Sequence, residues 1–242
     1  MRRPQAIELL DAWERGLAES PTARALTLLS ASTGAERERL ARLSLGERDR
    51  LLLSLREHLF GPRLEAVAEC PSCGERLEMS FAVSDVAVER DAGASDTLTL
   101  NDGGYEVVFR RLTSFDLLSV AHAPDAPSAR RSLFERSLLS ARRGEEEVAA
   151  ELLPDEVVGR VAAALAEADP QADVELALEC PGCGHAWGAP LDFVSFVWGE
   201  IDAWAMRTFG EVHALALAYG WGEREILSMS PWRRQLYLTM VT

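Results

Sequence analysis

The motif Cys-Pro-x-Cys-Gly occurs twice in this chain, as Cys70-Pro71-Ser72-Cys73-Gly74 and as Cys180-Pro181-Gly182-Cys183-Gly184. The two copies contain all four cysteines of the protein. A Cys-x-x-Cys turn can offer two thiolates to one metal ion, and a tetrahedral structural Zn²⁺ takes four. The motifs therefore predict one structural zinc with four ligands, Cys70, Cys73, Cys180 and Cys183. Such a site would hold two distant parts of the chain together and would define the architecture.

Other uses of the cysteines remain open at this point: two redox or disulfide pairs, or a catalytic metal with an open position. A redox Cys-x-x-Cys usually opens a helix in a βαβ unit. Here each motif lies between stretches of β-like alternation, 64–69 and 77–81 around the first and 174–179 and 187–193 around the second. His185 adjoins the second motif, and we expect it to be a neighbour because four cysteines already complete a tetrahedron.

The spacing of the two motifs also indicates an internal repeat. The offset that takes Cys70 to Cys180 also aligns Leu28-Leu29-Ser30-Ala31 with Leu138-Leu139-Ser140-Ala141. Identities continue without a gap through Gly34 and Gly144 to the cysteines. We interpret this as a duplication in which two related halves face one metal ion. The alternative is chance similarity between two helical segments rich in Leu, Ala and Glu.

Each half is expected to contain two helices followed by a ribbon of two strands. The predicted helices are 23–32 and 132–143, closed by Gly34 and Gly144, then 46–59 and 154–168. A hairpin over 96–110, turning at 101–104, precedes the second half, and helices over 194–219, 222–229 and 232–241 follow it. The predicted fold class is α+β, mainly helical. Its predicted domains are two repeat halves, 1–90 and 96–195, joined by a linker at 90–95, and a C-terminal segment, 196–242.

The composition limits the function classes. The formal charge is 25 − 39 = −14, which disfavours binding to nucleic acid or to anionic lipid. No apolar stretch approaches a membrane span, and the first residues do not resemble a signal peptide. We therefore expect a cytoplasmic protein, where cysteines stay reduced. The common hydrolase, nucleotide-binding and metalloprotease motifs are absent, so we expect no enzyme.

Aromatic residues near the C-terminus form a second candidate site. Trp and Tyr are enriched in binding hot spots, but they also build cores, and the sequence leaves both uses open. The candidate protein-interaction residues are Trp198, Trp204, Trp221, Trp232, Arg233, Arg234 and Tyr237.

Three further stretches resemble a known family. They are Tyr105–Thr113, the segment Leu53–Gly61 followed by Cys70 and Cys73, and the tail from Glu211 to Leu238. They resemble T4-type baseplate proteins of tailed phages and proteins of contractile-injection-system clusters described as baseplate or baseplate-hub assembly chaperones.

The resemblance implies a non-enzymatic assembly factor or component of a baseplate in a phage-tail-like contractile particle. It implies baseplate, hub or tail proteins as partners and no catalytic residues. The alternative is a cytoplasmic zinc-ribbon adaptor that binds and regulates another protein.

Overall fold

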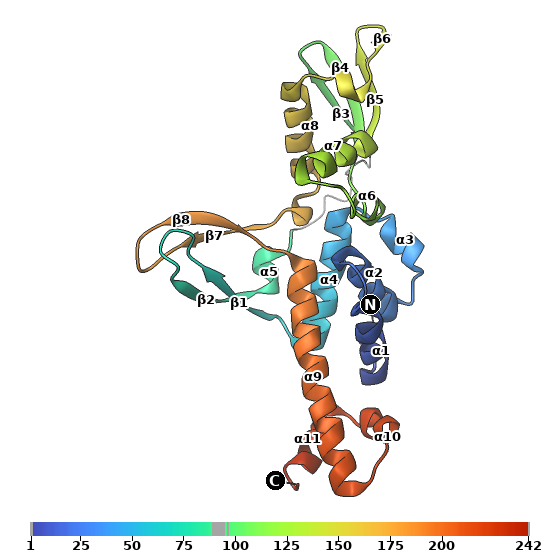
Figure 1. The fold of residues 1–242 in the computed structure, drawn as a ribbon, viewed down its shortest axis with the longest axis vertical. Coiled ribbons are helices and arrows are strands. Elements are labelled where there is room, and N and C mark those ends of the chain that lie inside the picture. Colours follow the sequence, from blue (N-terminus) through green and yellow to red (C-terminus); the bar gives the residue numbers. More distant parts are fainter. Residues whose placement is uncertain (1, 89–94, 96, 242) are drawn as a thin grey trace. The chain divides into compact units, whose positions relative to one another are not determined.

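The computed structural model describes residues 2–88, 95 and 97–241 (Figure 1). The fold is α+β and mainly helical, with small antiparallel sheets. By proximity of Cα atoms the chain divides into two compact units. We call Met1–Arg37 with Phe193–Thr242 the helical unit, and Glu38–Asp192 the ribbon unit.

The helical unit is formed by two segments that are far apart in the sequence. Its helices are α1 (Ala6–Gly16), α2 (Pro21–Thr33), α9 (Phe193–Tyr219), α10 (Glu223–Ser228) and α11 (Pro231–Leu238). Helix α2 begins at Ser20, whose side chain accepts a hydrogen bond from the Ala23 amide, and ends at Gly34 with φ of 72°. Trp13 joins the segments, because its indole N–H donates to Asp202 on α9 at 2.9 Å.

The ribbon unit contains two antiparallel ribbons, each preceded by a helix. The first helix is α4 (Leu45–Phe60), followed by β1 (Arg63–Glu69), β2 (Arg76–Ala82) and the short α5 (Val83–Val86). The second is α8 (Asp155–Ala168), followed by β7 (Glu175–Glu179) and β8 (Ala186–Pro190). The short helix α3 (Arg37–Ala41) crosses the division between the units.

A four-stranded sheet, ordered β3-β4-β5-β6, separates the two ribbons in the sequence. Its strands are β3 (Thr97–Asp102), β4 (Tyr105–Arg110), β5 (Leu138–Arg143) and β6 (Glu146–Glu147). Gly103 and Gly104 both have positive φ, 58° and 81°, as a two-residue hairpin turn of this hand requires. The predicted hairpin is confirmed over the described residues; its first predicted residue, Asp96, lies outside them.

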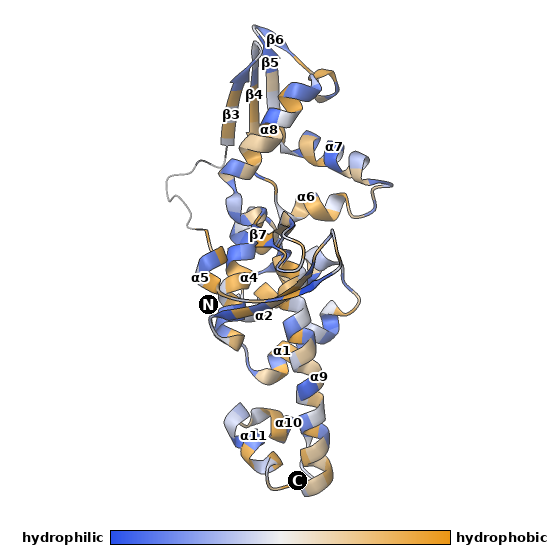
Figure 2. Ribbon diagram, turned by 90° about the vertical axis from the view of Figure 1, so that its left-hand side faces the viewer, coloured by the Kyte–Doolittle hydropathy of each residue, from blue (hydrophilic) through white to orange (hydrophobic). Residues whose placement is uncertain are grey.

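Helix α8 covers one face of this sheet. Val107 and Phe109 on β4, Ala141 on β5, and Val157 and Val161 on α8 are buried in one cluster. Hydrophobic and hydrophilic residues are interspersed along α8 and along β3 and β4, as expected for elements with one covered face (Figure 2).

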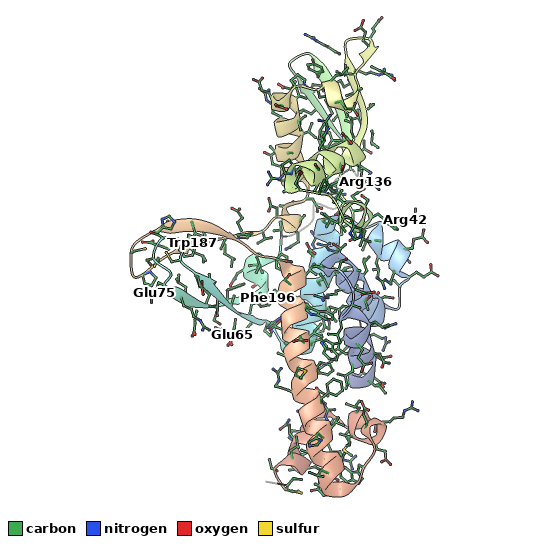
Figure 3. The ribbon with its side chains drawn as sticks, viewed as in Figure 1. Arg42, Glu65, Glu75, Arg136, Trp187 and Phe196 are labelled. Carbon is green, nitrogen blue, oxygen red and sulfur yellow. The ribbon has the colours of Figure 1, made fainter. Side chains whose placement is uncertain are left out.

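Two short helices connect β4 with β5: α6 (Ser114–Ser119) and α7 (Ala126–Ser137). Asp116 on α6 is buried and accepts bonds of 2.7 and 2.9 Å from the Arg110 guanidinium. Arg136, labelled in Figure 3, lies on the neighbouring α7. It donates to the same carboxylate at 3.1 Å. These charged hydrogen bonds fix the two helices to the end of β4. The Arg110 guanidinium and the amide and hydroxyl of Thr113 hold the pKa of Asp116 well below its usual range despite its burial.

One predicted helix is wrong. Residues 132–143 are not a single helix, because α7 ends at Ser137 and Leu138–Arg143 form strand β5. The strand pairs with β4, from Tyr105 opposite Arg143 to Phe109 opposite Leu138. Gly144 has a positive φ of 64°, but it follows a strand and does not close a helix.

Secondary structure nevertheless recurs from α4 onward, at the offset that relates Cys70 to Cys180. The starts of α4, β2 and α5, at Leu45, Arg76 and Val83, match the starts of α8, β8 and α9, at Asp155, Ala186 and Phe193. Before α4 the two halves differ, since α2 matches the end of α7 and the whole of β5. A common origin of the halves, with domains at 1–90, 96–195 and 196–242, stays a prediction. Most of the expected linker at 90–95 lies outside the described residues.

Residues just after α8 form a link to the part of the chain that carries the first ribbon, which the sequence did not indicate. Asp169 accepts hydrogen bonds from the Gly46 amide at 2.9 Å and the Ser44 hydroxyl at 3.2 Å, at the N-terminus of α4. Gln171 is buried, accepts from the Val88 amide at 2.7 Å and donates to the Val86 carbonyl at 3.2 Å. A carboxylate is favourable at a helix N-terminus, where free amides and the helix dipole attract it.

Candidate metal centre

Each Cys-Pro-x-Cys-Gly motif forms a tight turn at the tip of its ribbon. In the first, the Gly74 amide donates to the Cys70 carbonyl at 2.9 Å, and the Cys70 amide donates to the Glu75 carbonyl at 2.8 Å. In the second, the Gly184 amide donates to the Cys180 carbonyl at 2.8 Å, and the Cys180 amide donates to the His185 carbonyl at 2.9 Å. The glycines have φ of 75° and 71°, a conformation that strains residues with a side chain. The two motifs are therefore equivalent in structure as well as in sequence.

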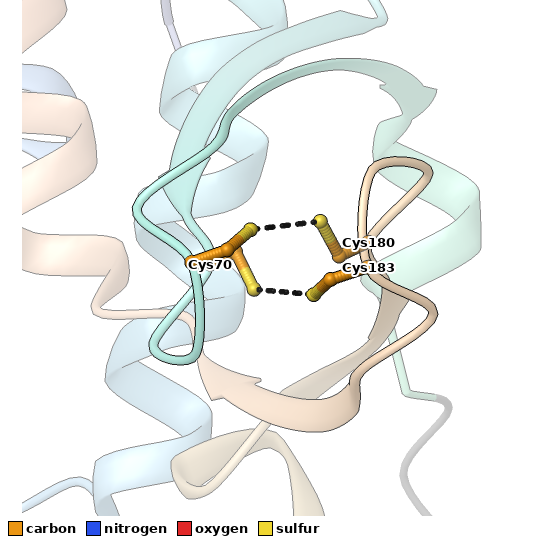
Figure 4. A group of neighbouring side chains, drawn as sticks. Cys70, Cys180 and Cys183 are labelled. Carbon is orange, nitrogen blue, oxygen red and sulfur yellow. Dashed lines mark hydrogen bonds between the residues drawn. The ribbon is translucent and has the colours of Figure 1, made fainter.

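The two turns face each other and bring all four sulfur atoms together (Figure 4). Cys70 Sγ lies 3.7 Å from Cys183 Sγ, and Cys73 Sγ lies 3.6 Å from Cys180 Sγ. All four sulfurs are within 4.8 Å of one another. A Zn–S bond of about 2.3 Å gives a tetrahedron with sulfur–sulfur edges of about 3.8 Å. The cluster thus has nearly the dimensions of a four-thiolate zinc site, whereas a disulfide needs about 2.05 Å between its sulfurs.

The cysteines differ in exposure in the same way in both turns. Cys70 and Cys180, the first of each pair, are buried, with exposed fractions of 2% and 1%, and Cys73 and Cys183 are exposed.

The crowded thiols influence one another's acidity. Burial disfavours a Cys70 thiolate, but the amides of Cys73 and Ser72 and the neighbouring thiols outweigh it and lower the pKa of Cys70 to about 7. The Glu75 amide favours a thiolate on Cys73, but the sulfurs of Cys183 and Cys180 raise its pKa to about 12. Several adjacent thiolates repel one another, and a bound cation is what allows all four to ionise together.

His185 and Glu75 occupy matching positions after the two turns. The His185 ring is not part of the cysteine cluster; it stacks on Trp187, with centroids 5.9 Å apart and planes at 14°. Glu75 lies near the opposite turn, its side chain 3.8 Å from where a Cβ on Gly182 would stand. In Figure 3, Glu75 is at the ribbon tip, whereas Glu65 lies farther back along the first ribbon. His185 is thus a neighbour of the cluster, as expected.

The C-terminal candidate residues do not form one surface. Trp198 is partly buried: it lies against Gly16, and the Arg24 guanidinium sits 4.6 Å from its ring centroid. Trp221 and Tyr237 contact each other edge to face, with centroids 4.9 Å apart. Trp204 is also partly buried, and Arg234 is buried in an ion pair with Glu211. Trp232 and Arg233 are exposed.

Comparison with known proteins identifies the family. A family model described as T4 bacteriophage base plate protein matches residues 23–198. The chain belongs to this family. The match includes both cysteine motifs and the sheet between them, and it ends within α9. No curated protein and no solved structure matches the chain.

Membership in the baseplate family gives the protein a baseplate-related role and confirms the resemblance seen in the sequence. The family is structural, which favours a non-enzymatic protein. Among the helices that the structure describes, none has the length and apolar character needed to cross a bilayer.

Proposed function

We propose that this protein is a non-enzymatic assembly factor or component of the baseplate of a phage-tail-like contractile particle, and that a structural Zn²⁺ stabilises it. The observation that carries the proposal is the family match over residues 23–198. The expected partners are baseplate, hub or tail proteins, and the expected location before assembly is the cytoplasm.

The proposed zinc ligands are Cys70, Cys73, Cys180 and Cys183. Support comes from the sulfur separations of 3.6 and 3.7 Å and from two equivalent turns that present the thiols from opposite sides. With four thiolates bound, zinc has no open position for a substrate, which fits a structural role. The metal would supply charge neutralisation and four directed bonds, and the chain supplies the turns that aim the sulfurs.

A zinc at this place would act as a clamp between the two ribbons. Antiparallel ribbons of two strands are marginally stable alone in water. Other contacts between these two parts of the chain lie away from the ribbon tips. Asp169 is hydrogen-bonded to residues 44–46, and Gln171 is hydrogen-bonded to residues 86–88. A metal at the tips would fix the ribbons and make them a rigid surface for assembly.

The test is to purify complete particles and assembly intermediates from a host that encodes the protein, and to quantify the protein and zinc in each. A component stays at fixed stoichiometry in the finished particle; an assembly factor is present only in intermediates. Absence from both would refute the baseplate role. Purified protein with no zinc after expression in zinc-supplemented medium would refute the metal assignment independently.

A further inference from the structure

Helix α11 carries a row of exposed apolar side chains. Trp232 and Leu236 are four residues apart, so they lie on one side of the helix. Met240 follows after four more residues, in the turn just beyond the last helical residue, Leu238. Their exposed fractions are 75%, 42% and 64%. We call these three residues the Trp232 stripe. Exposed apolar side chains that gather on one surface are a common feature of interaction sites.

The opposite side of α11 is firmly attached to α9. Arg234, 2% exposed, donates to Glu211 at 2.9 Å and to the Met229 carbonyl at 3.0 Å. Gln235 donates to the second oxygen of the same carboxylate at 2.6 Å. Tyr237 packs edge-on against Trp221. The stripe is therefore presented on a fixed helix, which reduces the entropy lost when a partner binds.

The charge around the stripe differs from that of the whole chain. The protein has 39 acidic residues, yet residues 226–242 contain none, while Arg233 is exposed beside the stripe. The segment 199–242 also lies outside the family match, so this surface is additional to the region shared with the family.

We propose that the Trp232 stripe docks in an apolar groove on another baseplate protein, and that the groove has carboxylates at its edge facing Arg233. An amphipathic helix in a groove is a common mode of recognition, with anchors at this spacing. If two copies of this chain paired through the stripe, their Arg233 side chains would lie close together. Residues 226–242 contain no acidic side chain to compensate this charge, so self-pairing is disfavoured. The net charge of −14 opposes binding to an anionic membrane. The inference rests on the proposed baseplate role and adds the partner's chemistry to it.

The test places a photoreactive benzophenone amino acid at position 232 of the full chain in the native host. A second variant carries it at position 152, where Leu152 is 73% exposed on the ribbon unit. After irradiation, the baseplate fraction is isolated and cross-linked peptides are identified by mass spectrometry. We expect position 232 to label one other baseplate protein, in an apolar peptide that contains Asp or Glu.

Binding to the labelled protein is then measured with purified variants. Removal of a central aromatic anchor typically costs at least 2 kcal/mol, so Trp232→Ala should weaken binding about 30-fold or more. Arg233→Glu should weaken it, whereas Arg233→Lys should largely preserve it. Arg224→Glu makes the same charge change on α10, at an exposed position, and should have little effect.

Three results would overturn the inference: labelling of a second copy of this chain, labelling of lipid, or equal effects of Arg233→Glu and Arg224→Glu. Absence of any cross-link from position 232 would also overturn it if wild-type protein is present in the baseplate fraction. If wild-type protein is absent both from the baseplate fraction and from the assembly intermediates, the proposed baseplate role itself fails.

Discussion

Replacement of Cys180 by serine should remove the clamp between the two ribbons. Cys180 is buried, and its sulfur lies 3.6 Å from that of Cys73, 107 residues away in the chain. A cross-link that closes a loop of this length lowers the entropy of the unfolded chain by about 5 kcal/mol at 25 °C. A neutral serine hydroxyl is a poor substitute for a thiolate on zinc. We therefore expect loss of stoichiometric zinc and destabilisation of the ribbon unit by about 3–5 kcal/mol.

Zinc content is measured by mass spectrometry, and stability by urea unfolding with added zinc or with a chelator. Hydrogen exchange locates the effect, which should be largest in the amides of 63–82 and 175–190. Chelation should destabilise the wild type by a similar amount and leave Cys180→Ser nearly unchanged, since both remove the same cross-link. Ser72→Ala, between the ligands at an exposed position, is the matched control and should keep zinc. If Cys180→Ser retains zinc and unfolds like the wild type, the clamp does not exist.

Further substitutions test the packing around these features. Asp116→Asn should cost about 2 kcal/mol at pH 7, because the buried side chain loses its charged hydrogen bonds with Arg110 and Thr113. The depressed native pKa of Asp116 stabilises the fold above the unfolded value near 4, so the difference from wild type should shrink in unfolding experiments as pH falls below about 4. Gly46→Ala would place a methyl group against the Asp169 carboxylate and should lower the melting temperature by several degrees; an unchanged value would contradict that packing. Trp198→Ala should destabilise the helical unit by about 3 kcal/mol, whereas Trp232→Ala should leave its unfolding unchanged, and equal effects would refute the division between packed and exposed tryptophans.

The clustering of the four cysteines could be predicted because its information is local. A Cys-x-x-Cys followed by glycine specifies both the turn and the direction of two sulfurs, and the second copy of the motif supplies the other pair. The helices preceding the ribbons were predicted for a similar reason. The helical spacing of their leucines and valines is also a local signal.

Strand β5 could not be predicted in this way. Leu138-Leu139-Ser140-Ala141 has the same residues as Leu28-Leu29-Ser30-Ala31, which lie in helix α2. Hydrogen bonding to β4 and burial of Ala141 beneath α8 override the helical preference of the segment. This strand pairing depends on residues far away in the chain, so a short stretch of sequence does not reveal it.

The burial of the C-terminal aromatic residues also depends on contacts that are distant in the sequence. Trp198 and Trp232 both lie on helices near the C-terminus, yet one lies against Gly16 and the other is exposed. The position of α1 beside α9 decides this difference. Leu236 and Met240 were missing from the predicted interaction residues, although their spacing from Trp232 was available as a signal.

The division of the helical unit has a consequence for synthesis on the ribosome. Helices α1 and α2 contact α9, but the whole ribbon unit, Glu38–Asp192, is translated between them. At about 5–20 residues per second, the N-terminal helices wait roughly 8–30 s for their partner to emerge. The ribbon unit is complete by then, including its last cysteine. Nascent chains therefore finish the cysteine cluster first, and a ribosome that stalls before α9 leaves α1 and α2 without the helix that covers them.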